Sequence, residues 1–316
     1  MSSTSRASAV VFDPAAAIPE LAAVRQAAER GDWPAVGALF AGCAEEEGRM
    51  VLADEVAGTA GAEHLLARVL EVRPNDPLAT ALLADRHIHL GWDARTSRRA
   101  QDVTAEGWQG FRHHLNRAEQ LLIGAVARDR GHAMAWSLRI TVAMGLSLGQ
   151  SEARRRQRCL SLASPHHYDG QRRLLQQLLP KWGGSWDAAH AFVHESVRAA
   201  PPGSICGALV ARYHVERLEE LGRQDRLAYA ARPDVRHELA GAAAASVLHP
   251  ACRVRYGLIT AHSMFALLAS LAGDPAAAAL HFRAMGPYGS TYPWGILGGQ
   301  PEETFAEHRA RALGRG

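Results

Sequence analysis

The segment LPKWGGSW, residues 179–186, combines residue types that could bind an anion. Lys181 is the chain's only lysine, and two glycines follow it after Trp182. A glycine pair lets the backbone approach a ligand, so the ammonium and successive N–H groups could meet an anion while an indole stacks on it. The alternative is a tight interhelical turn, in which Ser185 caps a helix that begins at Trp186. Lys181, Trp182 and Ser185 are therefore candidate ligand-binding residues beside this second interpretation.

A second set of chemical groups lies on the segment DRHIHLGWDAR, residues 85–95. On a helix, Asp85, His89, Trp92 and Arg95 would share one face, because they follow one another at spacings of four and three residues. A carboxylate beside an imidazole and a guanidinium could bind an acidic ligand or transfer protons. The alternative is a helix edge on which these charges form salt bridges.

The 16 histidines raise the question of a metal site. His190 and His194 have the best spacing, since two imidazoles one helical turn apart can bind a single cation. The HExxH order is absent, and a third ligand would have to come from elsewhere, for example from His214 or Glu216. We expect no metal, with His190 and His194 as the weak candidates.

Charge and motif content argue against nucleic-acid binding and the common cofactors. The arginine runs at 98–99, 154–158 and 172–173 are expected to be solvated helix faces, because 32 acidic residues nearly balance 35 basic ones. The sequence contains no GxSxG elbow, no P-loop and no dinucleotide motif behind a strand. We expect no cofactor, no nucleic-acid partner and no membrane partner.

The elements that position these residues are predicted to be helices. Of 316 residues, 47% are hydrophobic, which excludes a disordered chain, and no run approaches the roughly 18 apolar residues of a membrane span. Strong helix formers dominate, while only 6% of the residues are aromatic. Short Gly- and Pro-containing turns break the helical periodicity from Ile18 onward. At these breaks Asp76, Ser204 and Asp274 fit N-caps.

The domain organisation is predicted to be simple. Residues 1–17 are expected to form a flexible leader, and residues 18–316 a single helical-repeat domain, with a subdivision near residue 180 as the alternative. The irregular segment 286–301 is expected to return the final helix as a cap. Four cysteines, far apart and without a metal-finger spacing, suit reduced thiols in the cytoplasm.

Two resemblances to known families refine the fold. The string GDWPAVGALFAG, residues 31–42, resembles the first helix of a tetratricopeptide repeat, and residues 71–91 resemble the join between two repeats. The strings LGWDAR, GWQGFRHHLNRAEQLLIGAVARD, LLPKWGGSW and AAPPGS are similar to a bacterial family, seen especially in actinomycetes, that is known only as a domain of unknown function. The resemblances imply an all-α, tetratricopeptide-like right-handed array of antiparallel helix pairs, an α-solenoid of about 12 to 14 helices. They transfer no catalytic residue.

Two functions follow as hypotheses. The first is a cytoplasmic binding or scaffold protein whose concave, cationic and aromatic groove takes a protein, a peptide or a small acidic ligand, with a homodimer as an open alternative. Its predicted ligand-binding residues are Trp92, Arg95, Lys181, Trp182, Ser185, Tyr213 and His214. The second is an enzyme that uses the same groove, and its candidate catalytic residues are Asp85, His87, His89 and Lys181.

Overall fold

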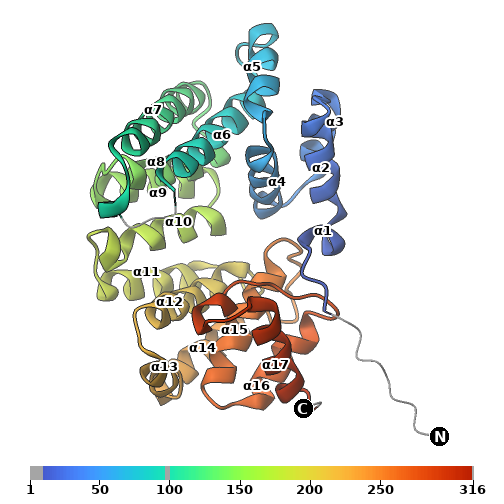
Figure 1. Ribbon diagram of the computed structural model, residues 1–316, viewed down its shortest axis with the longest axis vertical. Helices are drawn as coiled ribbons and strands as arrows, with labels where there is room; N and C mark the ends of the chain where they lie inside the picture. The colour runs from blue at the N-terminus through green and yellow to red at the C-terminus, as the bar shows by residue number, and fades with distance from the viewer. Residues whose placement is uncertain (1–9, 97–99, 315–316) are drawn as a thin grey trace, which may run out of the picture. The chain divides into compact units, whose positions relative to one another are not determined.

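The computed structural model describes residues 10–96 and 100–314, and within these ranges the chain is built from 17 α-helices (Figure 1). The described part contains no strand beyond an isolated bridge between Val11 and Tyr288. The α-helices are α1 (Pro14–Ala17), α2 (Pro19–Glu29), α3 (Trp33–Gly42), α4 (Glu46–Gly58), α5 (Ala62–Val72), α6 (Pro77–Arg95), α7 (Ala105–Arg128), α8 (Ala133–Gly145), α9 (Gln150–Ala163), α10 (Tyr168–Leu178), α11 (Trp186–Ala199), α12 (Ala208–Glu219), α13 (Arg223–Ala230), α14 (Pro233–Ala245), α15 (Leu258–Leu271), α16 (Pro275–Ala284) and α17 (Pro301–Ala312). Short 3-10 turns are η1 (Ala100–Asp102), η2 (Pro180–Trp182), η3 (Ile205–Gly207) and η4 (Trp294–Leu297). The all-α prediction is confirmed.

The helix boundaries follow local sequence signals. Asp76 and Asp274 cap α6 and α16, each accepting a backbone N–H three residues on, and each is followed by proline at the first helical position. Ser204 caps the 3-10 turn η3, which leads into α12. The expected count of about 12 to 14 helices was too low. Segments as short as α1, with four residues, and α13, with eight, carry too few turns to show a clear period.

The chain divides into two compact units, which we describe separately. The N-terminal unit comprises residues 19–192, and the C-terminal unit comprises residues 10–18 and 193–314. The division falls within α11, which is one unbroken helix. No helix in the described ranges is both long and apolar enough to cross a membrane.

Small residues allow close packing in the N-terminal unit. Ala79 and Leu82 on α6, and Ala135 and Leu138 on α8, are fully buried. The long helices α6 and α7 pack at Gly91, where an added Cβ would lie 3.4 Å from the Cβ of His114. Close approach of this kind builds a core without many aromatic residues.

The core of the C-terminal unit contains a fully buried tryptophan. Trp294, from the irregular segment before α17, is fully buried, and its indole N–H donates to Ser263 Oγ over 2.8 Å. Its ring stacks on Phe282 and meets Phe305 edge-on at 5.4 Å. This segment therefore packs inside the unit and anchors α17.

The described end of the expected leader also packs into the C-terminal unit. Val11 N donates to Pro287 O, and Gly289 N donates to Val11 O, each over 2.9 Å. The Phe12 ring meets Phe305 edge-on at 5.3 Å. Residues 1–9 lie outside the described residues.

Candidate functional site

Four aromatic rings and an arginine gather at the C-terminal end of α6 in the N-terminal unit. The guanidinium carbon of Arg95 lies 5.5 Å from the ring centroid of Trp92 and 5.4 Å from that of Trp108. Trp92 also meets Phe111 and Trp182 edge-on, with ring centroids 4.9 and 6.3 Å apart. We call these five residues the cationic–aromatic cluster. Its contacts join α6, α7 and η2.

A tight turn brings Trp182 to this cluster. Gly183, with a φ of +80°, ends η2 in the left-handed region, and a Cβ on Gly184 would lie 1.9 Å from Leu178 O. Ser185 Oγ accepts the N–H of Ala188 and so caps α11. The interhelical-turn interpretation and the predicted Ser185 cap are confirmed. Glycines are required here for the path of the backbone.

The structure brings together several residues predicted to bind a ligand. Trp92, Arg95 and Trp182 belong to the cationic–aromatic cluster, and Lys181 is exposed on η2 beside Trp182. Sequence reasoning missed Trp108 and Phe111, although their three-residue spacing on α7 was a signal. Tyr213 and His214, the two remaining candidates besides Ser185, lie on α12 in the C-terminal unit.

A second group of polar residues lies further along α6, toward its N-terminus. We call it the polar cluster, and it comprises Glu47, Asp54, Asp85, His89, Asp169, Arg172 and Arg173. His89 Nε2 lies 3.1 Å from Asp54 Oδ1, and this hydrogen bond raises the pKa of His89 and lowers that of Asp54. Asp85 is only 3% exposed, and burial raises its pKa to about 6 against the attraction of Arg173 and His89.

Asp169 pairs with two arginines in the same cluster. Its carboxylate receives N–H groups from Arg172 and Arg173, each over 2.5 Å, and the Ser137 hydroxyl over 2.7 Å. Burial would raise the pKa of Asp169, but the charges of Arg173 and Arg172 hold it well below its usual range. Arg173 also donates to the Thr141 hydroxyl. Asp169 therefore stays ionised, whereas Asp85 titrates near pH 6.

Glu47 contributes a further carboxyl group with a raised pKa. Burial is the main cause, although His167 and the backbone N–H of Tyr168, which donates to Glu47 Oε1 over 2.7 Å, both oppose it. Within the polar cluster two carboxyl groups, Glu47 and Asp85, thus hold protons more strongly than free carboxyls do.

The remaining catalytic candidates are not at the polar cluster. His87 Nδ1 lies 3.1 Å from His114 Nδ1 on α7, and burial lowers the pKa of His87 to about 4. Lys181 lies beside the cationic–aromatic cluster, whose Trp92 is seven residues beyond Asp85, or roughly 10 Å along the helix axis. The structure therefore places Asp85 and His89 near the middle of α6, and Arg95 at its C-terminal end, near Trp182.

The Asp54–His89 pair opens onto a pocket of about 340 Å³. Helices α2 and α4 supply most of its walls, and Arg25 pairs there with Glu55 over 2.7 Å. The lining residues are Arg25, Glu29, Asp54, Glu55, Gly58, Thr59, Ala60 and His89. A small polar molecule in this pocket would touch the His89 imidazole.

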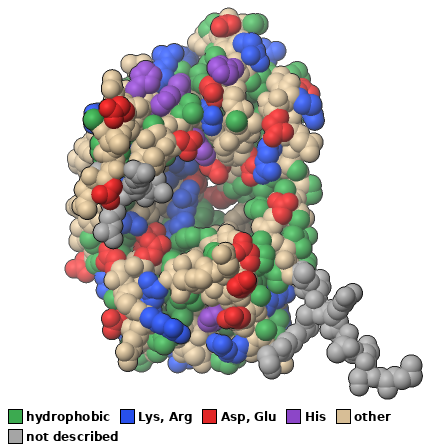
Figure 2. All heavy atoms as spheres, in the orientation of Figure 1, with side chains coloured by type: hydrophobic (Ala, Val, Ile, Leu, Met, Phe, Trp, Pro, Cys, Tyr) green, Lys and Arg blue, Asp and Glu red, His purple; other side chains and the backbone are tan. Residues whose placement is uncertain are grey.

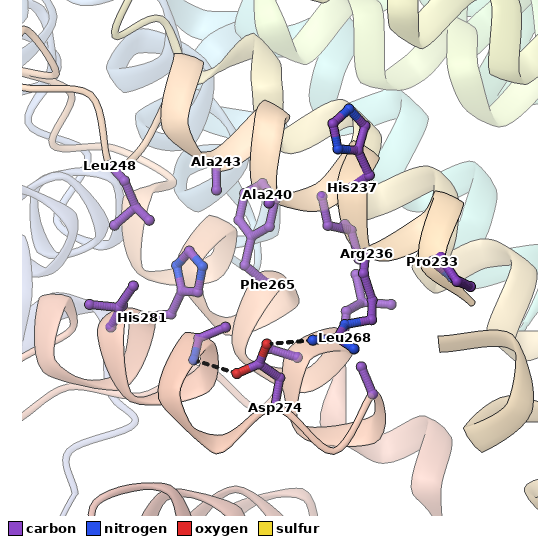
Figure 3. A pocket seen from close by; sticks show the side chains of 15 residues that line it. Pro233, Arg236, His237, Ala240, Ala243, Leu248, Phe265, Leu268, Asp274 and His281 are labelled. Carbon is purple, nitrogen blue, oxygen red and sulfur yellow. Dashed lines mark hydrogen bonds and ion pairs between the residues drawn. The ribbon is translucent and has the colours of Figure 1, made fainter. Parts of the chain in front are cut away.

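The C-terminal unit holds a larger, mostly apolar pocket of about 540 Å³ between α14, α15 and α16 (Figure 3). Figure 3 shows Leu248 and His281 on one side and Arg236 on the other, where Arg236 Nη2 pairs with Asp274 Oδ2 over 3.0 Å. None of these residues was predicted to line a pocket, because the three helices meet only in the tertiary structure.

The predicted metal candidates acquire a carboxylate neighbour that the sequence did not indicate. His194 Nε2 lies 3.1 Å from Glu238 Oε2 on α14. The same carboxylate oxygen lies 3.2 Å from His214 Nε2, and His214 Nδ1 lies 2.7 Å from the Tyr229 hydroxyl. His214, which the sequence offered as a possible third metal ligand, is instead a neighbour of Glu238, and Glu238 itself was missed.

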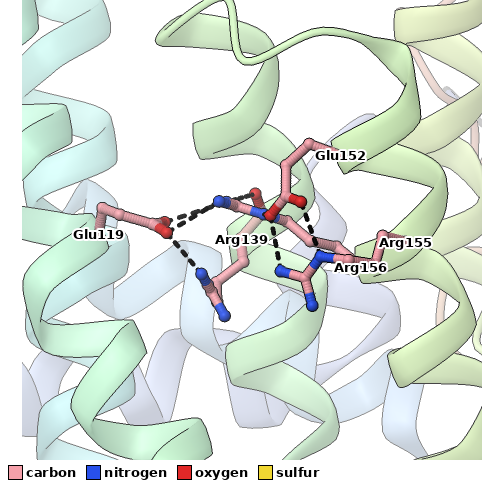
Figure 4. A network of polar contacts seen from close by, with 5 residues as sticks. All are labelled: Glu119, Arg139, Glu152, Arg155 and Arg156. Carbon is pink, nitrogen blue, oxygen red and sulfur yellow. Dashed lines mark hydrogen bonds and ion pairs between the residues drawn. The ribbon is translucent and has the colours of Figure 1, made fainter.

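The expectation that the arginine runs are solvated is partly wrong. Arg156 is only 2% exposed and pairs with Glu119 on α7 and with Glu152 on its own helix α9 (Figure 4). The Arg173 side chain is 15% exposed. A helix face can carry arginines and still be buried when carboxylates from neighbouring helices meet them. Arg98 and Arg99 lie outside the described residues. Acidic and basic side chains are interspersed over most of the face shown in Figure 2.

Comparison with known proteins adds no relative from which a function could be transferred. No protein-family model matches the chain, and neither a curated protein nor a solved structure is significantly similar to it. The resemblance to tetratricopeptide repeats and to the actinomycete-type family therefore stays a prediction. The function has to be argued from the residues themselves.

Proposed function

We propose that the chain is a helical-repeat binding protein that takes an acidic peptide or a small acidic ligand at the cationic–aromatic cluster and the adjacent Lys181. The observation that carries the proposal is the contact between Trp92 and Trp182. Through this contact, the two segments that the sequence singled out, one carrying Arg95 and the other Lys181, meet at one group of aromatic rings.

The chemistry of the cluster suits a carboxylate ligand. A guanidinium held over indole rings keeps a fixed orientation, and a planar, preorientated guanidinium recognises carboxylates through paired N–H groups. Lys181, which is exposed and directly precedes Trp182 on η2, adds a second positive charge. The aromatic side chains would add stacking area for a flat acid or an aromatic residue of a peptide.

Tryptophan fluorescence tests this function, because Trp92, Trp108 and Trp182 report on the cluster directly. The full chain is titrated with an oligoglutamate peptide and, separately, with citrate. The double variant Arg95→Gln/Lys181→Gln should weaken binding at least tenfold, at a cost of about 1 to 2 kcal/mol in unfolding free energy from the lost cation–π contacts.

The matched control is Arg232→Gln, which removes an exposed arginine that also lies over an aromatic ring. This variant should bind as the wild type does. Absence of saturable binding of either acid to the wild type, or equal loss in the control, would contradict the proposal.

A second candidate function is acid–base catalysis at the polar cluster, and the buried Asp85 favours it. A carboxyl group that titrates near pH 6, one helical turn from an imidazole held by Asp54, provides a proton donor and a proton acceptor in the neutral range. The pocket at His89 would admit a small polar substrate. Asp54 would orient the His89 ring, and Asp85 would tune its charge.

A panel of chromogenic esters, phosphoesters and glycosides, assayed from pH 4 to 9, tests this second function. Any turnover should show an inflection near pH 6 that Asp85→Asn removes and that the exposed control Asp225→Asn retains. Turnover with an unchanged pH profile in Asp85→Asn would contradict the role given to Asp85, and turnover retained in His89→Gln would contradict the catalytic role of His89.

A further inference from the structure

Helix α11 presents two imidazoles to a carboxylate of α14. His190 and His194 are one turn apart on this unbroken helix, and His194 Nε2 lies 3.1 Å from Glu238 Oε2. One ligand atom from each of His190, His194 and Glu238 lies within 4.8 Å of the other two, and all three residues are partly exposed. Two imidazole nitrogens and a carboxylate oxygen form the ligand set of zinc sites that keep a further position for water or substrate.

The separation of the His194 and Glu238 ligand atoms suits metal binding. Around a tetrahedral zinc ion with bonds of about 2.0 to 2.1 Å, neighbouring ligand atoms lie roughly 3.3 to 3.4 Å apart. The separation of 3.1 Å between His194 and Glu238 is close to this value. Because all three residues are partly exposed, an ion can reach them from solvent and a water molecule can complete its coordination.

A second layer of side chains holds the carboxylate in place. His214 is only 2% exposed, and its Nε2 lies 3.2 Å from the Glu238 oxygen that also faces His194. Its other ring nitrogen lies 2.7 Å from the Tyr229 hydroxyl. Such hydrogen bonds orient a metal-binding carboxylate before the ion arrives, which reduces the ordering required on binding.

We propose that His190, His194 and Glu238 bind a divalent transition-metal ion, Zn²⁺ in the first place, with His214 and Tyr229 as positioning residues. The three ligands include none of the residues used in the two functions above. The metal site can therefore be tested independently of both functions. Borderline nitrogen and oxygen donors select Zn²⁺ over Mg²⁺ and Ca²⁺, which prefer oxygen ligands alone.

Zinc titration of the full chain tests the site. The protein is stripped with a chelator and titrated with Zn²⁺ in competition with a chromophoric chelator at neutral pH. The wild type should bind one ion tightly. His190→Ala, His194→Ala and Glu238→Gln should each lower the affinity by about 100-fold or more, and Tyr229→Phe by about tenfold, as expected for a positioning residue.

His237→Ala is the matched control, because His237 precedes Glu238 on α14 but lines the separate apolar pocket. It should bind Zn²⁺ as the wild type does. Substitution with Co²⁺ gives an independent readout, since a tetrahedral Co²⁺ site absorbs strongly in the visible range and the ligand variants should lose that band.

Three outcomes would overturn the proposal: no stoichiometric Zn²⁺ binding by the wild type, wild-type affinity in the ligand variants, or an equal loss in His237→Ala. Should Glu238→Gln fail to fold, as circular dichroism would show, His190→Ala decides the question, because the partly exposed His190 can be truncated with less risk to the core.

Discussion

Two groups of buried charges in the N-terminal unit differ in how completely they are paired. In the first, Glu119 receives N–H groups from Arg139 over 2.6 Å and from Arg156 over 2.8 Å, and Glu152 joins Arg156 over 2.7 Å (Figure 4). Hydrogen bonds from Arg155, and further ones from Arg156, lower the pKa of Glu152 to about 2. We call these residues the arginine–glutamate network.

The polar cluster also combines carboxyl groups with arginines, but its two arginines donate hydrogen bonds to Asp169 and not to Asp85. Asp169 is thus paired with both arginines. Burial is the largest influence on Asp85 and raises its pKa to about 6. Complete pairing lowers the pKa of a carboxyl group and joins helices, whereas incomplete pairing leaves a proton that can be exchanged near neutral pH. The two groups of charges therefore differ in whether a carboxyl group is held ionised between helices or can exchange a proton near pH 6.

The largest expected effect comes from breaking the arginine–glutamate network. Glu119→Gln removes the charge shared by Arg139 and Arg156, whose side chains are 8% and 2% exposed. An uncompensated buried charge should cost about 3 to 5 kcal/mol of unfolding free energy, measured by urea denaturation. A loss below about 1 kcal/mol would show that the network contributes no more than an exposed ion pair does.

A smaller effect of opposite sign is expected at Asp85. Its pKa of about 6 exceeds the usual value of 3.8, so the unfolded chain loses this proton first and stability falls as the pH rises from about 4 to 6. Above pH 6 the full penalty of two pKa units, about 3 kcal/mol, opposes folding. Asp85→Asn should remove most of it and flatten the pH dependence of stability in this window.

Denaturation of the wild type and Asp85→Asn at pH 4, 5, 6 and 7 measures this difference. The unfolding free energies of the two proteins should be most alike at pH 4, and the advantage of the variant should grow up to about pH 6 and then level off. Parallel curves would mean that Asp85 does not titrate in this range, and the distinction between the two groups of charges would fail.

The smallest effect is expected at the exposed edge of the arginine–glutamate network. Arg155 pairs with Glu152 three residues away, and its side chain is 46% exposed. Arg155→Ala should lower the unfolding free energy by about 0.2 to 1 kcal/mol at low salt. At high salt, where the ion pair is screened, the variant and the wild type should be equally stable. Comparison with Glu119→Gln in the same denaturation series then isolates burial as the variable. A cost as large as that of Glu119→Gln would refute this explanation.

Much of the local structure could be predicted from the sequence. The N-caps at Asp76 and Asp274, and the turn at residues 183–185, depend on residues within a few positions of each other. The helix that carries Asp85, His89 and Arg95 followed from helical spacing alone. Local chemistry fixes such features because their partners are neighbours in the chain.

The pairing of charges could not be predicted in the same way. Arg156 and Glu119 are 37 residues apart, His89 and Asp54 are 35 apart, and His194 and Glu238 are 44 apart. The same arginine run was expected to be solvated because its composition does not show which helix covers it. His87 and His89 are two positions apart, yet His87 contacts His114 and His89 contacts Asp54, because different helices pack against them.

The sequence by itself determined an all-α chain, the positions of several helix starts and the residue types available for chemistry, since propensity, capping and spacing act over a few residues. Only the tertiary structure decided which carboxyl group meets an arginine and which does not. That choice depends on which helices pack together, and it decides that Asp169 is ionised, that Asp85 titrates near pH 6, and that Glu238 lies beside two histidines.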